Sequence, residues 1–113
     1  MPEETMERVK ETLKELEKPT EPGQLKRKLG KAYSVFSQIN ELPIEHRKQF
    51  ITRLEEAAKT HERMDETLAI ISAIEYTEHH SNKAALKRLQ KEHPTQDGKN
   101  FANEALMRLK QLE

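Results

Sequence analysis

The chain contains no cysteine and little of several other residue types. Its 113 residues include 5 prolines, 3 glycines, 3 phenylalanines, 2 tyrosines and no tryptophan. The lack of cysteine excludes disulfide bonds, thiolate metal sites and cysteine nucleophiles. No apolar run approaches the roughly 20 residues that a membrane-spanning helix needs, and the acidic start of the chain is unlike a cationic secretory leader. We therefore expect a soluble cytoplasmic protein that makes no membrane contact.

Strongly apolar side chains are also few, which limits the core. Ile, Val, Leu and Phe make up about a fifth of the chain, close to the composition of disordered proteins. However, 20 Lys and Arg residues balance 20 Asp and Glu residues, so the self-repulsion typical of disordered chains is missing. We expect one folded domain over residues 1–113, with a thin core that leaves little room for an internal cofactor.

Stretches rich in Glu, Lys, Leu, Ala, Gln and Arg alternate with short clusters of Pro or Gly, which is typical of helices joined by turns. No segment alternates apolar and polar residues as a half-buried strand would. The sequence predicts an all-α protein, a small bundle of about five to six helices. The predicted helices are 3–18, 24–42, 44–62, 64–79, 82–92 and 100–112. We expect a break near Thr60, because one helix over 44–78 would be about three times the mean helix length.

The first predicted helix, 3–18, carries a narrow apolar stripe among charged residues, and a proline-containing linker, 19–23, follows it. A narrow stripe of this kind suits two arrangements. The helix either docks on the rest of the chain or forms a peripheral element that binds a partner.

Several residues carry local predictions. Gly30 lies within a predicted helix, where glycine costs about 1 kcal/mol relative to alanine, so close packing is expected there. Residues 64–78 are the most apolar segment and are expected at the centre of the bundle. Ser81 and Asn82 are expected to cap the helix that follows them, and His93 to be a turn residue at a helix C-terminus. The five aromatic residues fall on or beside apolar stripes, which favours core positions for all of them.

One short segment resembles a repeat family. Leu29-Gly30-Lys31-Ala32-Tyr33 is similar to the L-G-x-x-Y core of a tetratricopeptide first helix. The match does not extend, because Pro43 interrupts the helix that should follow. A second partial match, from Tyr76 to Ala85, has His80 where the family usually has glycine. We therefore assign no family.

Linear motifs for catalysis or metal binding are missing. The five histidines include two helical pairings with a carboxylate, Glu75 with His79 and His61 with Asp65, but two ligands on one helix do not complete a metal site. No serine lies in a nucleophile elbow, and no glycine-rich loop could hold a phosphate. We expect neither an enzyme nor a metal or other cofactor.

Charge is distributed unevenly along the chain. Residues 64–82 contain four acidic residues and no Lys or Arg, whereas 83–93 are rich in Lys and Arg. If a second basic cluster over 26–31 shared a face with this one, the two could hold a phosphate backbone. Nucleic-acid binding is therefore the alternative function. Its candidate residues are Lys26, Arg27, Lys28, Lys31, Lys87 and Arg88.

The function that the sequence favours over nucleic-acid binding is that of a non-catalytic protein-interaction module, acting as an adaptor, regulator or inhibitor. The first and last predicted helices each carry an apolar stripe that could form a seam with a partner helix or with a second copy of the chain. Basic residues beside such a seam would tune the association rate. The candidate seam residues are Leu13, Leu16, Leu109 and Leu112, and the candidate rim residues are Lys83, Lys87, Arg88 and Lys91.

Overall fold

The computed structural model describes residues 2–61 and 63–112, apart from the side chains of residues 2, 31, 32 and 35. Six α-helices and one 3₁₀ helix account for nearly all of the described chain, which contains no strand, so the predicted all-α class is confirmed. In chain order they are α1 (Pro2–Glu17), α2 (Leu25–Phe36), η1 (Ser37–Glu41), α3 (Ile44–Thr60), α4 (Met64–Tyr76), α5 (Ser81–Glu92) and α6 (Gln96–Gln111).

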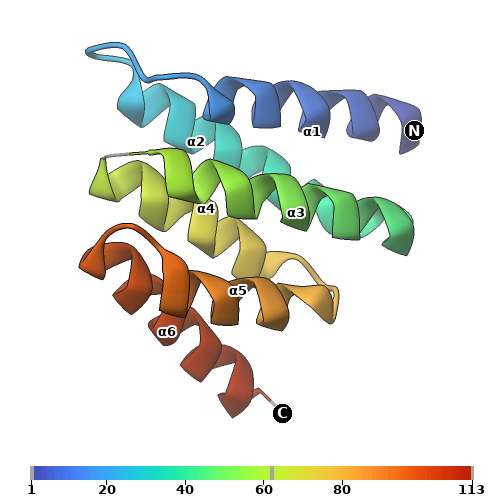
Figure 1. Ribbon diagram of the computed structural model, residues 1–113. Helices are drawn as coiled ribbons and strands as arrows, with labels where there is room; N and C mark the ends of the chain where they lie inside the picture. Colours follow the sequence, from blue (N-terminus) through green and yellow to red (C-terminus); the bar gives the residue numbers. More distant parts are fainter. Residues whose placement is uncertain (1, 62, 113) are drawn as a thin grey trace.

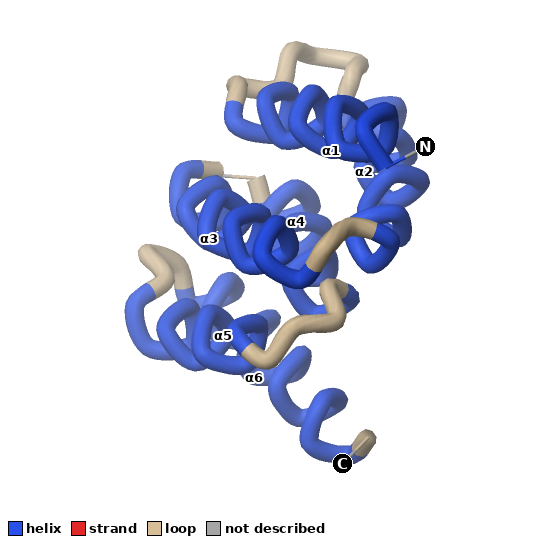
Figure 2. The backbone as a smooth tube through the Cα atoms, turned by 90° about the vertical axis from the view of Figure 1, so that its right-hand side faces the viewer, coloured by secondary structure: helices blue, strands red, loops and turns tan. Residues whose placement is uncertain are grey.

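The helices form three hairpins that stack on one another. α1 pairs with α2, α3 with α4 and α5 with α6, and each hairpin packs on the next one along the chain. Figure 1 shows α1, α3 and α5 as one layer in front of α2, α4 and α6, and Figure 2 shows the same order from the side. The molecule measures 38 × 37 × 19 Å, and its short dimension matches two helix layers about 10 Å apart.

The core runs between the two layers and includes apolar residues from all six helices. On α1, Val9, Leu13 and Leu16 are fully buried in it. α1 therefore belongs to the folded body and is not a separate peripheral helix. α4 lies at the centre, as expected, in contact with α2, α3, α5 and α6.

The predicted and observed helices differ most at two places, and the other helix ends agree to within three residues. The predicted helix 24–42 is divided, because α2 ends at Phe36 and the chain continues as a 3₁₀ turn. The predicted start of the last helix at residue 100 is wrong. α6 begins at Gln96, since the hydroxyl of Thr95 accepts a hydrogen bond from the Gly98 N–H at 3.0 Å and caps the helix. The break near Thr60 is confirmed, with α3 ending there and α4 beginning at Met64.

Close packing at glycine occurs at Gly98 and not at Gly30. A Cβ atom on Gly30 would meet nothing within 4 Å, so the prediction for that residue is wrong. A Cβ atom on Gly98 would lie only 2.1 to 2.4 Å from atoms of the His93 ring. This turn therefore excludes larger side chains at residue 98.

Asn82 caps the preceding helix and not the following one. Its buried side-chain amide donates to the carbonyl oxygens of Ile74, Glu75 and Thr77 at 3.4, 3.3 and 3.0 Å. These carbonyls lie at the C-terminal end of α4, where helical partners run out. At the start of α5, Nδ1 of His79 accepts from the Ser81 N–H at 3.0 Å.

Candidate functional site

The predicted leucine seam does not form a single surface. Leu13 and Leu16 are buried in the core, Leu109 is partly buried against it, and Leu112 is 83% exposed. α1 and α6 also belong to the first and last hairpins of the stack (Figure 1). The stripe on α1 covers the protein's own core, so these two leucines are not available to a partner in the folded protein.

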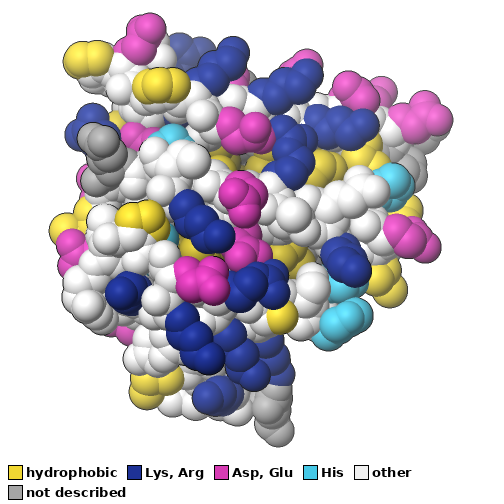
Figure 3. All heavy atoms as spheres, in the orientation of Figure 1, with side chains coloured by type: hydrophobic (Ala, Val, Ile, Leu, Met, Phe, Trp, Pro, Cys, Tyr) yellow, Lys and Arg dark blue, Asp and Glu magenta, His cyan; other side chains and the backbone are white. Residues whose placement is uncertain are grey.

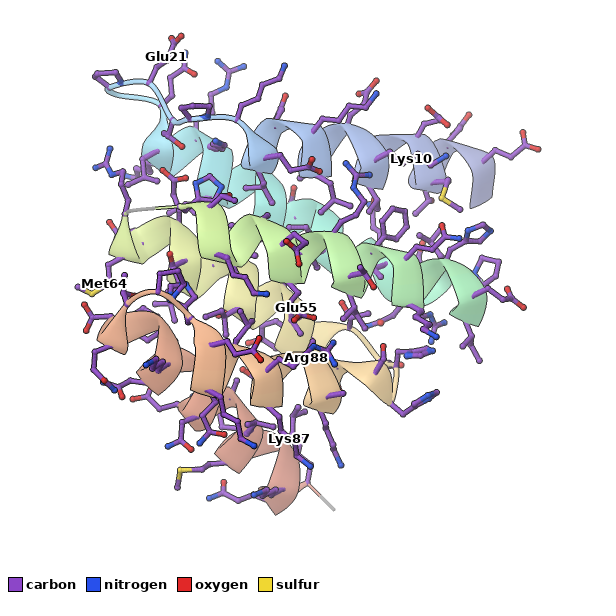
Figure 4. The ribbon with its side chains drawn as sticks, in the orientation of Figure 1. Lys10, Glu21, Glu55, Met64, Lys87 and Arg88 are labelled. Atoms are coloured by element: carbon purple, nitrogen blue, oxygen red, sulfur yellow. The ribbon has the colours of Figure 1, made fainter. Side chains whose placement is uncertain are left out.

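The predicted basic rim lies along α5, where Lys87, Arg88 and Lys91 are exposed and Lys83 is partly buried. Figure 3 shows Lys and Arg side chains gathered over the third hairpin. Arg88 is held by α3: its Nε and Nη2 donate to Oε2 and Oε1 of Glu55 at 2.8 and 2.7 Å (Figure 4). This hydrogen bond raises the pKa of Arg88 above its ordinary value. Arg88 of the rim therefore joins the third hairpin to the second.

The two basic clusters considered for nucleic-acid binding do not share a face. Lys26, Arg27 and Lys28 lie on α2, in the first hairpin, whereas Lys87 and Arg88 lie on α5, in the third hairpin and the other layer (Figure 1). Lys28 is also engaged locally, since its ammonium donates to the Lys18 carbonyl at 2.9 Å and to the Thr20 hydroxyl at 2.8 Å. The side chain of Lys31 lies outside the described residues. The shared face on which the alternative depended is therefore absent from the described part of the chain.

Among the described side chains, the largest regular group of exposed apolar residues lies on α4. Met64, Leu68 and Tyr76 are 52%, 39% and 64% exposed, and the partly buried Ser72 continues the same spacing of four residues. Residues four apart lie on one side of a helix. We call these four residues the α4 stripe. Met64 projects at the edge of the molecule from the start of α4 (Figure 4).

Hydrogen bonds and charges hold the end of the α4 stripe in place. On η1, the side-chain amide of Asn40 donates to the Tyr76 carbonyl at 2.9 Å and accepts from the Glu78 N–H at 2.6 Å. Next to Tyr76, Glu75 accepts two hydrogen bonds from Arg108 of α6 at 2.9 and 2.8 Å. That contact raises the pKa of Arg108. The stripe is therefore displayed on a fixed helix.

Two exposed carboxylates, Asp65 and Glu78, lie near the two ends of the α4 stripe. Neither forms an ion pair with another described residue. α4 itself carries no Lys or Arg. Asp65 therefore places a negative charge on α4 beside the start of the stripe, and Glu78 places another two residues beyond the end of α4. The exposed Arg63 directly precedes Met64.

Sequence reasoning missed this surface because α4 is apolar on nearly every side. Its inward positions, including Ile70, Ile71 and Ile74, hid the separate spacing of Met64, Leu68 and Tyr76. Tyr33 on α2 is likewise exposed, so the expectation of core positions for all aromatic residues is wrong for both tyrosines. One sign of an unpaired surface was present in the sequence: α4 contains no Lys or Arg with which Asp65 could pair.

His61 is a second notable position, at the junction of α1, α3 and α4. Its Nδ1 lies 2.6 Å from Oε2 of the buried Glu66, and its Nε2 contacts the carbonyl oxygen of Leu16. The two residues line a cleft of about 590 Å³ together with Glu17, Thr20 and Arg63. With both ring nitrogens engaged, His61 has no free nitrogen with which to accept a proton from a substrate.

The carboxylate and histidine pairs considered for metal binding are otherwise engaged. Glu75 binds Arg108, and His79 bonds to Ser81. His61 pairs with Glu66, so the expected neighbour Asp65 is not its partner. No group of three or more possible ligands is brought together among residues 2–61 and 63–112. None of the helices described is both long enough and apolar enough to cross a membrane.

Comparison of the chain with protein-family models, with curated proteins and with solved structures finds no significant match.

Proposed function

We propose that this protein is a non-catalytic interaction module that binds an amphipathic helix of a partner protein on the α4 stripe. The observation that carries the proposal is the row of exposed Met64, Leu68 and Tyr76 on the helix that lies at the centre of the fold. The rest of the apolar surface of α4 is buried. An amphipathic partner helix binds through apolar residues three or four apart, which is the spacing that the α4 stripe offers.

The dimensions of the stripe define the partner. Residues 64 to 76 span roughly 18 Å at a rise of about 1.5 Å per residue, which corresponds to three to four turns of a facing helix. Asp65 and Glu78 border the stripe near its two ends. We therefore expect the partner helix to carry Lys or Arg toward both ends, about three to four turns apart. These charges would favour fast encounter and the correct register more than affinity.

The test uses a displayed library of 15-residue helical peptides, selected against the full chain. Selected peptides are expected to share apolar residues three or four apart with basic residues near both ends. Their binding is then measured with Met64→Asp and Leu68→Asp, which place a charge in the stripe. Met107→Asp on α6 is the matched control, because Met107 is 54% exposed, almost the same as Met64, but lies outside the stripe.

Both stripe variants are expected to bind the selected peptides with an affinity about 10-fold or more lower than the parent chain. This change corresponds to the loss of a central contact worth about 1.4 kcal/mol. The Met107 variant should bind as the parent does. Absence of any enriched peptide, or equal loss in all three variants, would contradict a site on α4. Tight binding of RNA or DNA that survives the stripe substitutions would instead favour the nucleic-acid alternative.

A further inference from the structure

Basic side chains and imidazole rings gather where the turn between α4 and α5 meets α3. The turn supplies His79 and His80, and α3 supplies Arg47 and Lys48. The rings of the two histidines are stacked, with centroids 4.3 Å apart and planes inclined by 27°. Figure 3 shows histidine side chains beside a Lys or Arg side chain at this edge of the molecule. We call these four residues the turn cluster.

Arg47 holds the turn cluster in place. Its guanidinium donates hydrogen bonds to three backbone carbonyl oxygens, those of Leu42, Glu78 and Asn40. The bond to Glu78 joins α3 to the residue that directly precedes His79. Carbonyl oxygens satisfy the donors of a guanidinium but carry no full negative charge. The positive charge of Arg47 is therefore fixed beside the turn without being neutralised.

The other three side chains of the turn cluster leave hydrogen-bond donors available. Nδ1 of His79 accepts from the Ser81 N–H at 3.0 Å, so a neutral ring carries its proton on Nε2. Nε2 of His79, the ring of His80 and the ammonium of Lys48 make no hydrogen bond to any residue that the structure describes. His80 and Lys48 are also exposed. A ligand that accepts hydrogen bonds can therefore use all three.

No carboxylate compensates the positive charge of the turn cluster. Within residues 2–61 and 63–112, none of its four members forms an ion pair. The acidic residue next to it, Glu78, is exposed and pairs with none of them. Burial, followed by the positive charges of His80, Lys48 and Arg47, lowers the pKa of His79. Positive charge therefore dominates the surroundings of that ring.

We propose that the turn cluster is a binding site for a phosphomonoester group. Such a group carries about 1.5 to 2 negative charges at neutral pH and has three oxygens that accept strong hydrogen bonds. The donors of Lys48, His79 and His80 match these three oxygens, and the charge of Arg47 adds attraction at longer range. A carboxylate or a phosphodiester carries a single charge and offers fewer free oxygens, so both match the cluster less well.

The first experiment titrates the full chain with inorganic phosphate and follows the histidine ring signals by NMR. The ionic strength is kept constant so that screening does not change. We expect the signals of His79 and His80 to shift together and to saturate. The pKa of His79 should also rise on saturation, because a bound negative charge favours the protonated ring. The absence of a saturable shift, or an unchanged pKa of His79 with phosphate bound, overturns the proposal.

The matched variants are Lys48→Gln and Lys87→Gln. Both lysines are exposed, and neither forms an ion pair with a described residue, but only Lys48 belongs to the turn cluster. We expect Lys48→Gln to weaken phosphate binding by about fivefold or more, as for the loss of one charge-assisted hydrogen bond. Lys87→Gln should bind phosphate as the parent does. Equal weakening by the two substitutions would show a general response to positive charge and overturns the site.

The phosphate site does not depend on the α4 stripe, so the two proposals can fail separately. Met64→Asp, which is expected to weaken the binding of helical peptides, should leave phosphate binding unchanged. Loss of phosphate binding in this variant, with the fold retained, would contradict a site built from the turn cluster.

Three further probes identify the source of the phosphate. They are a library of peptides with a central phosphoserine, the same library with glutamate in its place, and single-stranded DNA, whose phosphates are diesters. Tighter binding of phosphopeptides than of inorganic phosphate assigns the site to a phosphorylated partner protein, and equal binding assigns it to a free phosphomonoester. Equal or tighter binding of the glutamate peptides or of the DNA overturns the assignment to a phosphomonoester.

Discussion

The guanidinium of Arg88 on α5 makes two hydrogen bonds to the buried carboxylate of Glu55 on α3, at 2.8 and 2.7 Å. It is the contact by which the third hairpin neutralises a charge inside the second. Arg88→Ala leaves that buried carboxylate without its bidentate partner, so it is expected to lower the free energy of unfolding. The expected loss is about 1 to 2 kcal/mol and not more, because the arginine side chain is half exposed and water screens the contact. Chemical denaturation measures the change.

Lys87→Ala, at the neighbouring exposed position on α5, is the control for Arg88 and should change stability by less than about 0.5 kcal/mol. Equal effects of the two substitutions would show that the contact with Glu55 contributes nothing to stability.

Two glycine substitutions should have opposite signs. A methyl group at Gly98 would lie within 2.4 Å of the His93 ring, so Gly98→Ala is expected to destabilise the protein by about 1 to 3 kcal/mol. Gly30 lies on an exposed helical position with free space around it, and Gly30→Ala is expected to stabilise by about 0.4 to 1 kcal/mol. Thermal unfolding of both variants gives the comparison. A stable Gly98→Ala variant would mean that the His93 ring moves freely.

The two leucines at the extremes of exposure test whether α1 is part of the core. Leu13→Ala should lower the free energy of unfolding by about 2 to 5 kcal/mol, because it leaves a cavity among fully buried side chains. Leu112→Ala removes a side chain that is 83% exposed and should change it by less than about 0.5 kcal/mol. Similar small changes in both would indicate that α1 is detached in solution.

His79 is expected to remain neutral at a pH where an ordinary histidine is charged. Burial, together with the positive charges of His80, Lys48 and Arg47, lowers its pKa. Since the folded state then binds this proton less readily than the unfolded chain, the contribution of His79 to stability falls as the pH drops below the ordinary histidine range. His80→Gln removes one positive neighbour, so NMR titration should show the pKa of His79 moving up toward its ordinary value. An unchanged pKa would assign the whole effect to the other causes.

Helix identity could be predicted from the sequence because its causes are local. The spacing of Val9, Leu13 and Leu16 and the break between Thr60 and Met64 depend on residues within one or two turns of each other. The start of α6 was missed for an equally local reason, since Thr95 caps a turn that contains Gly98, and glycine obscured the cap.

The candidate surface could not be predicted in the same way. Leu13 and Leu68 look alike in sequence, as apolar residues within predicted helices, yet the first is buried and the second is exposed. The partner of an acidic residue was also undetermined, since Glu55 binds Arg88 and Glu66 binds His61 across turns and hairpins.

The amino-acid sequence by itself determined an all-α, cysteine-free chain with its main helices and turns, because helix formation depends on periodicity, caps and breakers within a few residues. Only the tertiary structure decided which apolar stripes are covered and which charges are paired. Whether an apolar stripe is covered depends on how much of its area the neighbouring helices remove from water. Whether two charges pair depends on the distance between residues that are far apart in the chain. The stacking of three hairpins therefore buried the predicted leucine seam and left Met64, Leu68 and Tyr76 at the surface.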